Sequence, residues 1–172
     1  MTEHTEDTKR YILSVLVGDV PGILARIVSL FTGRGFNIDS LTVGHATTSD
    51  GELGGIALSR MTIVTSANSM PIDHIVAQIR KLVDVLDVQN LGEKTYVEAD
   101  ITLVKVHVSS PLEQAAALTV ATTSFRATSM ITRDDYLIFR FPGREDASKA
   151  FIDAMRRFGE VDSVYSGTIA LA

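Results

Sequence analysis

The chain has 172 residues, of which 45% are hydrophobic and 22% charged, with no cysteine and a formal net charge of −5. The absence of cysteine excludes thiolate metal sites, cysteine nucleophiles and disulfides. The charge is spread evenly, −3 in residues 1–90 and −2 in residues 91–172. Because neither half is a basic lobe, the composition argues against nucleic acid as a partner.

The first ten residues, MTEHTEDTKR, are polar and mixed in charge. A secretory signal requires a basic start followed by an apolar stretch, and this segment has neither. No apolar run reaches the roughly 18 residues that suggest a membrane span. We therefore expect residues 1–9 to form a disordered tail, and the protein to be cytoplasmic with no membrane partner.

The first half of the chain predicts elements in the order β-α-β-β-α-β. Runs of β-prone apolar residues indicate strands, and apolar residues at helical spacing indicate helices. Gly33 and Gly35 predict the end of the first helix, and a change of apolar phase near Asp39 predicts a β-bulge. The expected elements are strand 11–17, helix 23–31, strand 36–43, strand 56–65, a helix from Ser69 and Pro71 to Leu82, and strand 83–91.

The second half repeats this plan with an offset of roughly 85 residues, which is the length of one small domain. The expected elements are strand 97–108, a helix opened by Ser110 and Pro111, strands 125–132 and 136–141, helix 147–158 and strand 161–169. Each half matches the split-βαβ motif, in which both helices cover one face of an antiparallel sheet.

The predicted fold class is therefore α+β, with two ferredoxin-like βαββαβ domains in tandem. We expect the domains at residues 10–91 and 96–172, joined by a linker at 92–95. The strands of the first domain are apolar on both faces, although its helices cover only one. Another subunit is expected to cover the second face.

Groups that carry chemistry are scattered. The four histidines (positions 4, 45, 74 and 107) have no partners at zinc-binding spacing. Gly33-Arg34-Gly35 lacks the further glycine or lysine of a phosphate loop. Glu98 and Asp100 share one face of a strand, but no pocket signal accompanies them. We expect no catalytic residue and no metal ligand.

The turn from Asp19 to Leu24 (DVPGIL) differs from an ordinary strand-to-helix connection. Pro21 suits the first turn of a helix, and Gly22 lets a ligand approach the backbone closely. The amides of Gly22, Ile23 and Leu24 would lie at a helix N-terminus, which favours an anion. Asp19 is placed to accept from an ammonium group. The turn predicts either a site for a small zwitterion or a plain connection.

The pattern Asp-x-Pro-Gly-x-Leu-x-Arg-Ile from Asp19, followed by Gly-Phe-Asn-Ile at 35–38, resembles an ACT domain, an amino-acid-sensing module. Longer segments of the sequence resemble the small, regulatory subunit of acetolactate synthase. These segments are residues 12–17, 34–43, 58–63 and 81–85, and the similarity is weaker at 101–106 and 125–127. Residues 45–55 form a longer loop than is typical of bacterial members of that family.

The resemblance implies that 10–91 is an ACT regulatory domain that binds valine at an interface between two ACT domains. It places Asp19, Val20, Pro21, Gly22, Ile23 and Leu24 of one protomer on one wall of the site, and Asn37 and Ile38 of the neighbour on the other. Asn37 would accept from the ammonium through its carbonyl oxygen, while Ile23, Leu24 and Ile38 would line the isopropyl pocket.

The same resemblance implies a homodimer and a partner, the catalytic large subunit of acetolactate synthase. That subunit, and not this chain, would carry thiamine diphosphate, Mg²⁺ and FAD and condense two pyruvates to acetolactate in branched-chain amino acid biosynthesis. The small subunit would stimulate it and mediate feedback inhibition by valine. The alternatives are a stand-alone ACT protein that senses amino acids for another enzyme or regulates transcription, and an enzyme in its own right.

Overall fold

The computed structural model describes residues 9–47, 57–67 and 72–172. The predicted disordered tail 1–9 lies outside the described residues except for Lys9, as does most of the loop 45–55. The expected helix start at Ser69 and Pro71 also lies outside them. The chain forms two compact units, residues 1–97 with 168–172 and residues 98–167.

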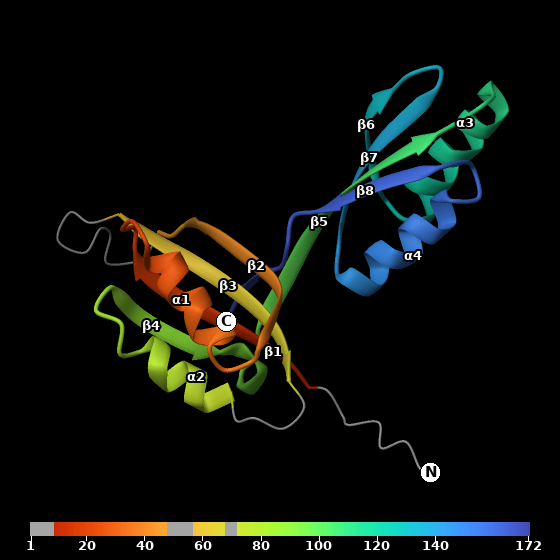
Figure 1. The fold of residues 1–172 in the computed structure, drawn as a ribbon. Helices are drawn as coiled ribbons and strands as arrows, with labels where there is room; N and C mark the ends of the chain where they lie inside the picture. The colour runs from red at the N-terminus through yellow and green to blue at the C-terminus, as the bar shows by residue number, and fades with distance from the viewer. Residues whose placement is uncertain (1–8, 48–56, 68–71) are drawn as a thin grey trace, which may run out of the picture. The chain divides into compact units, whose positions relative to one another are not determined.

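The first unit contains the six predicted elements and a short 3₁₀ helix. They are β1 (Lys9–Gly18), α1 (Ile23–Thr32), β2 (Asn37–His45), β3 (Leu58–Ala67), α2 (Ile72–Ile79), β4 (Val85–Asn90) and η1 (Leu91–Glu93). The strands form a four-stranded antiparallel sheet in the order β2-β3-β1-β4, and both helices cover one face of it (Figure 1). The register of β2 against β3 shifts between Ile38 and Ser40, where the bulge was predicted.

The core of the first unit lies between this sheet and its helices. Successive residues of a strand point to opposite faces, so Leu13, Val15 and Val17 of β1 share the helical side, and all three are fully buried. Ile27 and Phe31, four residues apart on α1, are also fully buried. Burying each such side chain contributes about 1.5–3 kcal/mol, which fixes α1 and the turn that precedes it.

The opposite face of this sheet is covered in part by the chain itself. Ile12 and Val64 pack with Leu91 of η1 and with Ala170, near the end of the chain. The amide of Thr168 also donates to the hydroxyl of Ser40 at 3.1 Å. The expectation that another subunit covers this face is therefore wrong for the area around Ile12 and Val64, because the C-terminal residues return to it.

The second unit has the same topology as the first. Its elements are β5 (Val97–His107), α3 (Pro111–Thr119), the π-helical turn η2 (Val120–Ser124), β6 (Thr128–Thr132), β7 (Tyr136–Gly143), α4 (Glu145–Met155) and β8 (Val161–Tyr165). Its antiparallel strands follow the order β6-β7-β5-β8, the counterpart of β2-β3-β1-β4. The predicted fold class, two ferredoxin-like units in one α+β chain, is confirmed.

The end of the chain differs from the sequence prediction. The single strand expected at 161–169 is divided into β8 and β9 (Ile169–Leu171). Gly167 interrupts it with φ +83°, a conformation that glycine adopts without steric cost. Residues 168–172 then belong to the first unit, whereas the expected second domain ran through to residue 172.

The C-terminal return makes a testable contribution to stability. Ala170 is 7% exposed, whereas the neighbouring Leu171 is 62% exposed. We expect Ala170→Asp to lower the free energy of unfolding by about 2 kcal/mol, because it buries a carboxylate against apolar side chains. Leu171→Asp is the matched control and should change it little. Urea denaturation followed by circular dichroism measures both, and equal effects of the two variants would contradict the packing described.

Candidate functional site

The turn between β1 and α1 is built on a left-handed residue. Gly22 has φ +86° and ψ −7° and precedes the first residue of α1. A Cβ placed there would meet no atom within 4 Å, so glycine is favoured by the backbone conformation and not by crowding. Pro21 and Gly22 are both exposed. The backbone of the turn is therefore accessible to a ligand.

The N-terminus of α1 carries no side-chain cap. The amide of Arg26 donates to the carbonyl of Gly22 at 3.1 Å, which closes the first helical turn. The amide of Ile23, expected to be free, donates to Val20 across a long distance of 3.4 Å. The leading amides of a helix lack acceptors within the helix and point along its axis, so this end of α1 suits a carboxylate.

Three contacts fix the turn to the rest of the first unit. The amide of Gly18 donates to the carbonyl of Asp84 at 2.9 Å, and the amide of Asp19 donates to Ala57 at 2.8 Å. The guanidinium of Arg26, on the first turns of α1, binds the carboxylate of Asp84 at 2.5 Å. The helix N-terminus is thereby held against the residues that precede β4.

The side chains of the turn differ in accessibility. Ile23 is 4% exposed and belongs to the core of its own unit, so its side chain does not face a ligand. Val20 is half-buried and packs against that core, whereas Leu24 is 39% exposed. Of the predicted pocket-lining residues in the turn, Leu24 thus offers an accessible apolar side chain, and Ile23 offers only its backbone.

Asp19 lies beside a residue that the sequence analysis did not include in the site. The Nδ1 atom of His45 is 3.8 Å from the carboxylate of Asp19. The two residues are distant in sequence, and the sheet register brings them together, because His45 lies opposite Ser59 and Ser59 lies opposite Val17. No local sequence pattern identifies this pair.

Asn37 and Ile38 begin β2. The side-chain nitrogen of Asn37 donates to Asp39 at 3.0 Å, and the other oxygen of Asp39 accepts from Ser66 at 2.6 Å. This contact engages the amide nitrogen of Asn37. Asn37 is exposed, and Ile38 is half-buried against the core.

The two groups of predicted site residues lie at opposite ends of the sheet. Asn37 is paired with Ser66, which is paired with Arg10, so Asn37 is level with Arg10 on β1. Asp19 directly follows Gly18, eight residues further along β1, and that length of strand spans about 26 Å. A single chain therefore does not bring Asn37 and Asp19 to the same small ligand.

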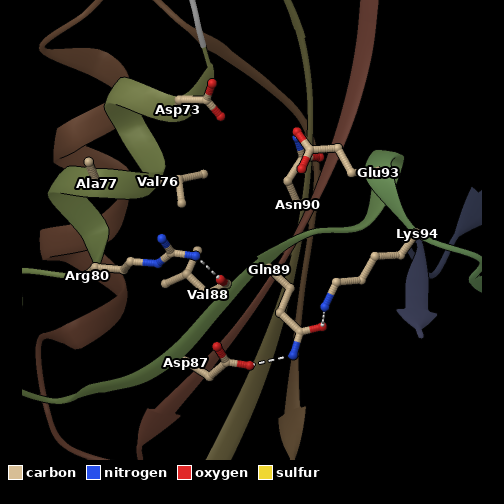
Figure 2. Close-up of a pocket in the computed structure, with 10 residues that line it drawn as sticks. All are labelled: Asp73, Val76, Ala77, Arg80, Asp87, Val88, Gln89, Asn90, Glu93 and Lys94. Atoms are coloured by element: carbon tan, nitrogen blue, oxygen red, sulfur yellow. Dashed lines mark hydrogen bonds between the residues drawn. The ribbon is translucent and has the colours of Figure 1, made fainter.

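A cavity of about 520 Å³ lies elsewhere in the first unit, between α2 on one side and β4 and η1 on the other (Figure 2). Its lining is mostly polar and charged, with Val76, Ala77 and Val88 as the apolar members, and it contains none of the predicted site residues. Arg80, directly after α2, donates to the carbonyl of Val88 at 3.0 Å, and Lys94 donates to the side chain of Gln89 at 3.0 Å. No local sequence pattern predicts this cavity.

The remaining candidates for chemistry are Glu98 and possible metal ligands, and the described residues give neither a functional arrangement. Glu98 forms an ion pair with Arg144 at 3.0 Å. Within residues 9–47, 57–67 and 72–172, no three histidine or acidic side chains gather as a metal site would require. In the same ranges, no helix has the length and apolar character needed to cross a membrane.

Comparisons with known proteins agree on one family. Residues 13–87 match the family model for an AHAS small subunit-like ACT domain, and residues 99–172 match that for the small subunit of acetolactate synthase. A probable acetolactate synthase small subunit of Archaeoglobus fulgidus is 36% identical over 162 residues, which cover 94% of this chain and 96% of that one. The acetolactate synthase small subunit of Mycobacterium bovis is 33% identical over 164 residues, with coverages of 95% and 92%.

A solved structure is similar over the same extent. The crystal structure of the acetolactate synthase small subunit from Thermotoga maritima matches with a TM-score of 0.78 at 28% identity. The match covers 95% of this chain and 96% of that chain. The similarity therefore includes both units.

The ion pair that holds the turn can be tested with a double-mutant cycle. We expect Arg26→Ala and Asp84→Ala to show a coupling energy of about 0.5–1 kcal/mol, the upper range for partly exposed pairs. The side chains of this pair are 46% and 28% exposed. The pair Lys149–Glu145, at 65% and 63%, is the control and should couple more weakly. Equal coupling energies in urea denaturation would show that Arg26 and Asp84 do not fix the turn.

Proposed function

The chain belongs to the family of acetolactate synthase small subunits, and from this premise we propose that it binds free valine between two copies of its first unit. As a small subunit it is a regulatory partner of a catalytic subunit. We further propose that this catalytic subunit, with thiamine diphosphate, Mg²⁺ and FAD, forms acetolactate for branched-chain amino acid synthesis. Bound valine would mediate feedback inhibition of that reaction.

The observation that carries the proposal is the exposed, left-handed turn at Gly22 at the uncapped N-terminus of α1. Backbone amides and the helix dipole favour an anion there without any basic side chain. A free amino acid presents a carboxylate to such a site. Each hydrogen bond to the charged group contributes about 1.5–3 kcal/mol.

The distance between Asn37 and the turn supports a site shared by two copies. β2 is an edge of the sheet, and edge strands are sites of pairing with another chain. Leu41 is the central residue of Asn37–His45. If two copies of β2 pair antiparallel about Leu41, Asn37 of one copy lies opposite His45 of the other, whose own neighbour is Asp19. A two-fold axis would then create two identical sites.

The side chains around such a site match an aliphatic zwitterion. The carbonyl oxygen of Asn37 and the carboxylate of Asp19 would accept from the ammonium group. Leu24, Val20 and Ile38 would contact the aliphatic side chain, and burying an isopropyl group contributes about 1.5–3 kcal/mol. A methylene group changes binding by only about 1–3 kcal/mol, so leucine and isoleucine would compete with valine.

Regulation follows if valine changes the relative stability of two arrangements of the dimer. Coupling between two sites of this kind is typically about 1–3 kcal/mol. Coupling is reciprocal, so valine and the catalytic subunit would alter each other's affinity for this chain by the same factor. Co-purification of the chain with its catalytic subunit, with and without valine, measures that factor.

The anion site is tested by a charge placed at Gly22. We expect Gly22→Asp to abolish valine inhibition, because the aspartate carboxylate would occupy the anion site and repel the carboxylate of valine. Association with the catalytic subunit should persist. Gly22→Asn is the matched control, since asparagine tolerates the left-handed conformation as aspartate does and carries no charge. Valine titrations of acetolactate formation provide the measurement. Undiminished inhibition in Gly22→Asp would rule out this placement of the site.

The second wall is tested at Asn37. We expect Asn37→Ala to weaken valine binding by about 1 kcal/mol or more, because one hydrogen bond to the ammonium is lost. Ser66→Ala removes the other hydrogen bond to Asp39 and leaves Asn37 in place, so it should bind valine normally. Isothermal titration calorimetry measures both variants. Identical affinities in the two would argue against a direct role for Asn37.

A further inference from the structure

The cavity between α2 and β4 has the form of a groove along a strand edge. It follows four consecutive residues of β4, from Asp87 to Asn90. Figure 2 shows the side chains of α2 along one side and those of β4 and η1 along the other. Four residues of strand extend over about 13 Å. The cavity is therefore long enough to take an extended peptide segment.

The backbone of β4 is available along this groove. β4 is the edge of the sheet opposite β2, and in the described sheet its pairing partner is β1. An edge strand presents N–H and C=O groups that another chain can bind. The carbonyl of Val88 receives Arg80 instead of a strand, at 3.0 Å. An arginine that swings aside would release this carbonyl to an incoming backbone amide.

The charges of the groove are not neutralised by one another. Arg80 and Lys94 bind the oxygens of uncharged groups, the Val88 carbonyl and the Gln89 amide. Within the described part of the chain, the carboxylates of Asp73, Asp87 and Glu93 form no ion pair with a lysine or arginine. Asp87 and Glu93 accept only from neutral amides, those of Gln89 and Asn90. Three carboxylates against two cations leave the groove with an excess of one negative charge, and none of the three carboxylates is held by a cation of the described chain.

We propose that this groove is the docking site for an extended, basic segment of the catalytic subunit, which pairs with the β4 edge and contacts Asp73 and Glu93. The inference rests on the proposed function in one respect, the two-fold pairing of β2. That pairing would leave β4 outermost in both copies, so the regulatory dimer would offer two identical grooves. Each groove would hold one catalytic chain, which gives a stoichiometry of one to one.

The test reverses the charge of the groove. Asp73 and Glu93 are both exposed, so the double variant Asp73→Lys with Glu93→Lys should fold normally. We expect the double variant to bind the catalytic subunit of the same organism at least about tenfold more weakly than the wild type does. We also expect added salt to weaken binding of the wild type more steeply than binding of the double variant. The control is Asp134→Lys with Asp135→Lys, two exposed residues between β6 and β7, which makes the same change of net charge. Biolayer interferometry measures the affinities.

The outcomes separate this inference from the proposed function. Calorimetry with valine should give the same affinity for the double variant and the wild type, because the groove lies apart from the Gly22 turn. If the wild type binds the catalytic subunit and both double variants bind equally well, the docking site is wrong and the regulatory function stands. A change in the size of the free small subunit, seen by light scattering, would assign the groove to a second copy and also overturn the proposal. Asp73→Asn with Glu93→Gln repeats the test without added positive charge.

Discussion

The backbone conformation at Gly22 is the constraint on which the candidate site depends. A residue at φ +86° turns the chain sharply between the end of β1 and the start of α1, so the helix begins without a side-chain cap. The buried residues Ile23, Ile27 and Phe31 hold that helix against the sheet, and Arg26 ties its first turns to Asp84. The core thus determines the direction of the helix axis, and the axis determines where an anion is stabilised. The proposed recognition of a carboxylate would in this sense be a consequence of hydrophobic packing.

The topology then limits how a small ligand can be held. An antiparallel sheet of this order places the β1–α1 turn and the start of β2 at opposite ends, and no side-chain rotation bridges about 26 Å. A site that uses both must combine two copies in opposite orientations. The proposed site would exist only in a dimer, so ligand occupancy and the arrangement of the two copies would be linked. This linkage is what an allosteric regulator requires, because a ligand shifts an equilibrium only by its different affinity for two states.

Most of the fold was predictable because its signals are local. The apolar, β-prone run of β1 and the helical apolar stripe ending at Phe31 each follow from one short stretch of sequence. The bulge beside Asp39 is likewise visible in the sequence as a change of apolar phase. What the sequence did not reveal depends on contacts between distant segments. Gly167 divides the last strand, and the residues after it return to the first unit. There Ala170 packs on Ile12, on the apolar face of the first sheet that the helices do not cover. Residues of the same apolar type, such as Ile23 and Leu24, differ in exposure only through their position on the helix.

In the proposed arrangement, the two edges of the first sheet serve two different partners. β2 carries an amide and a carboxylate at its start, Asn37 and Asp39, and its exposed edge suits a second copy. β4 is bordered by the charged side chains of α2 and η1, whose carboxylates lack cationic partners in the described chain. Between the edges lie β3 and β1, joined by an unbroken register from Lys9 to Gly18. In the proposed dimer, a shift in the pairing of β2 would pass to β4 through the hydrogen-bonded sheet, and this would give the proposed regulatory state a physical route to the catalytic partner.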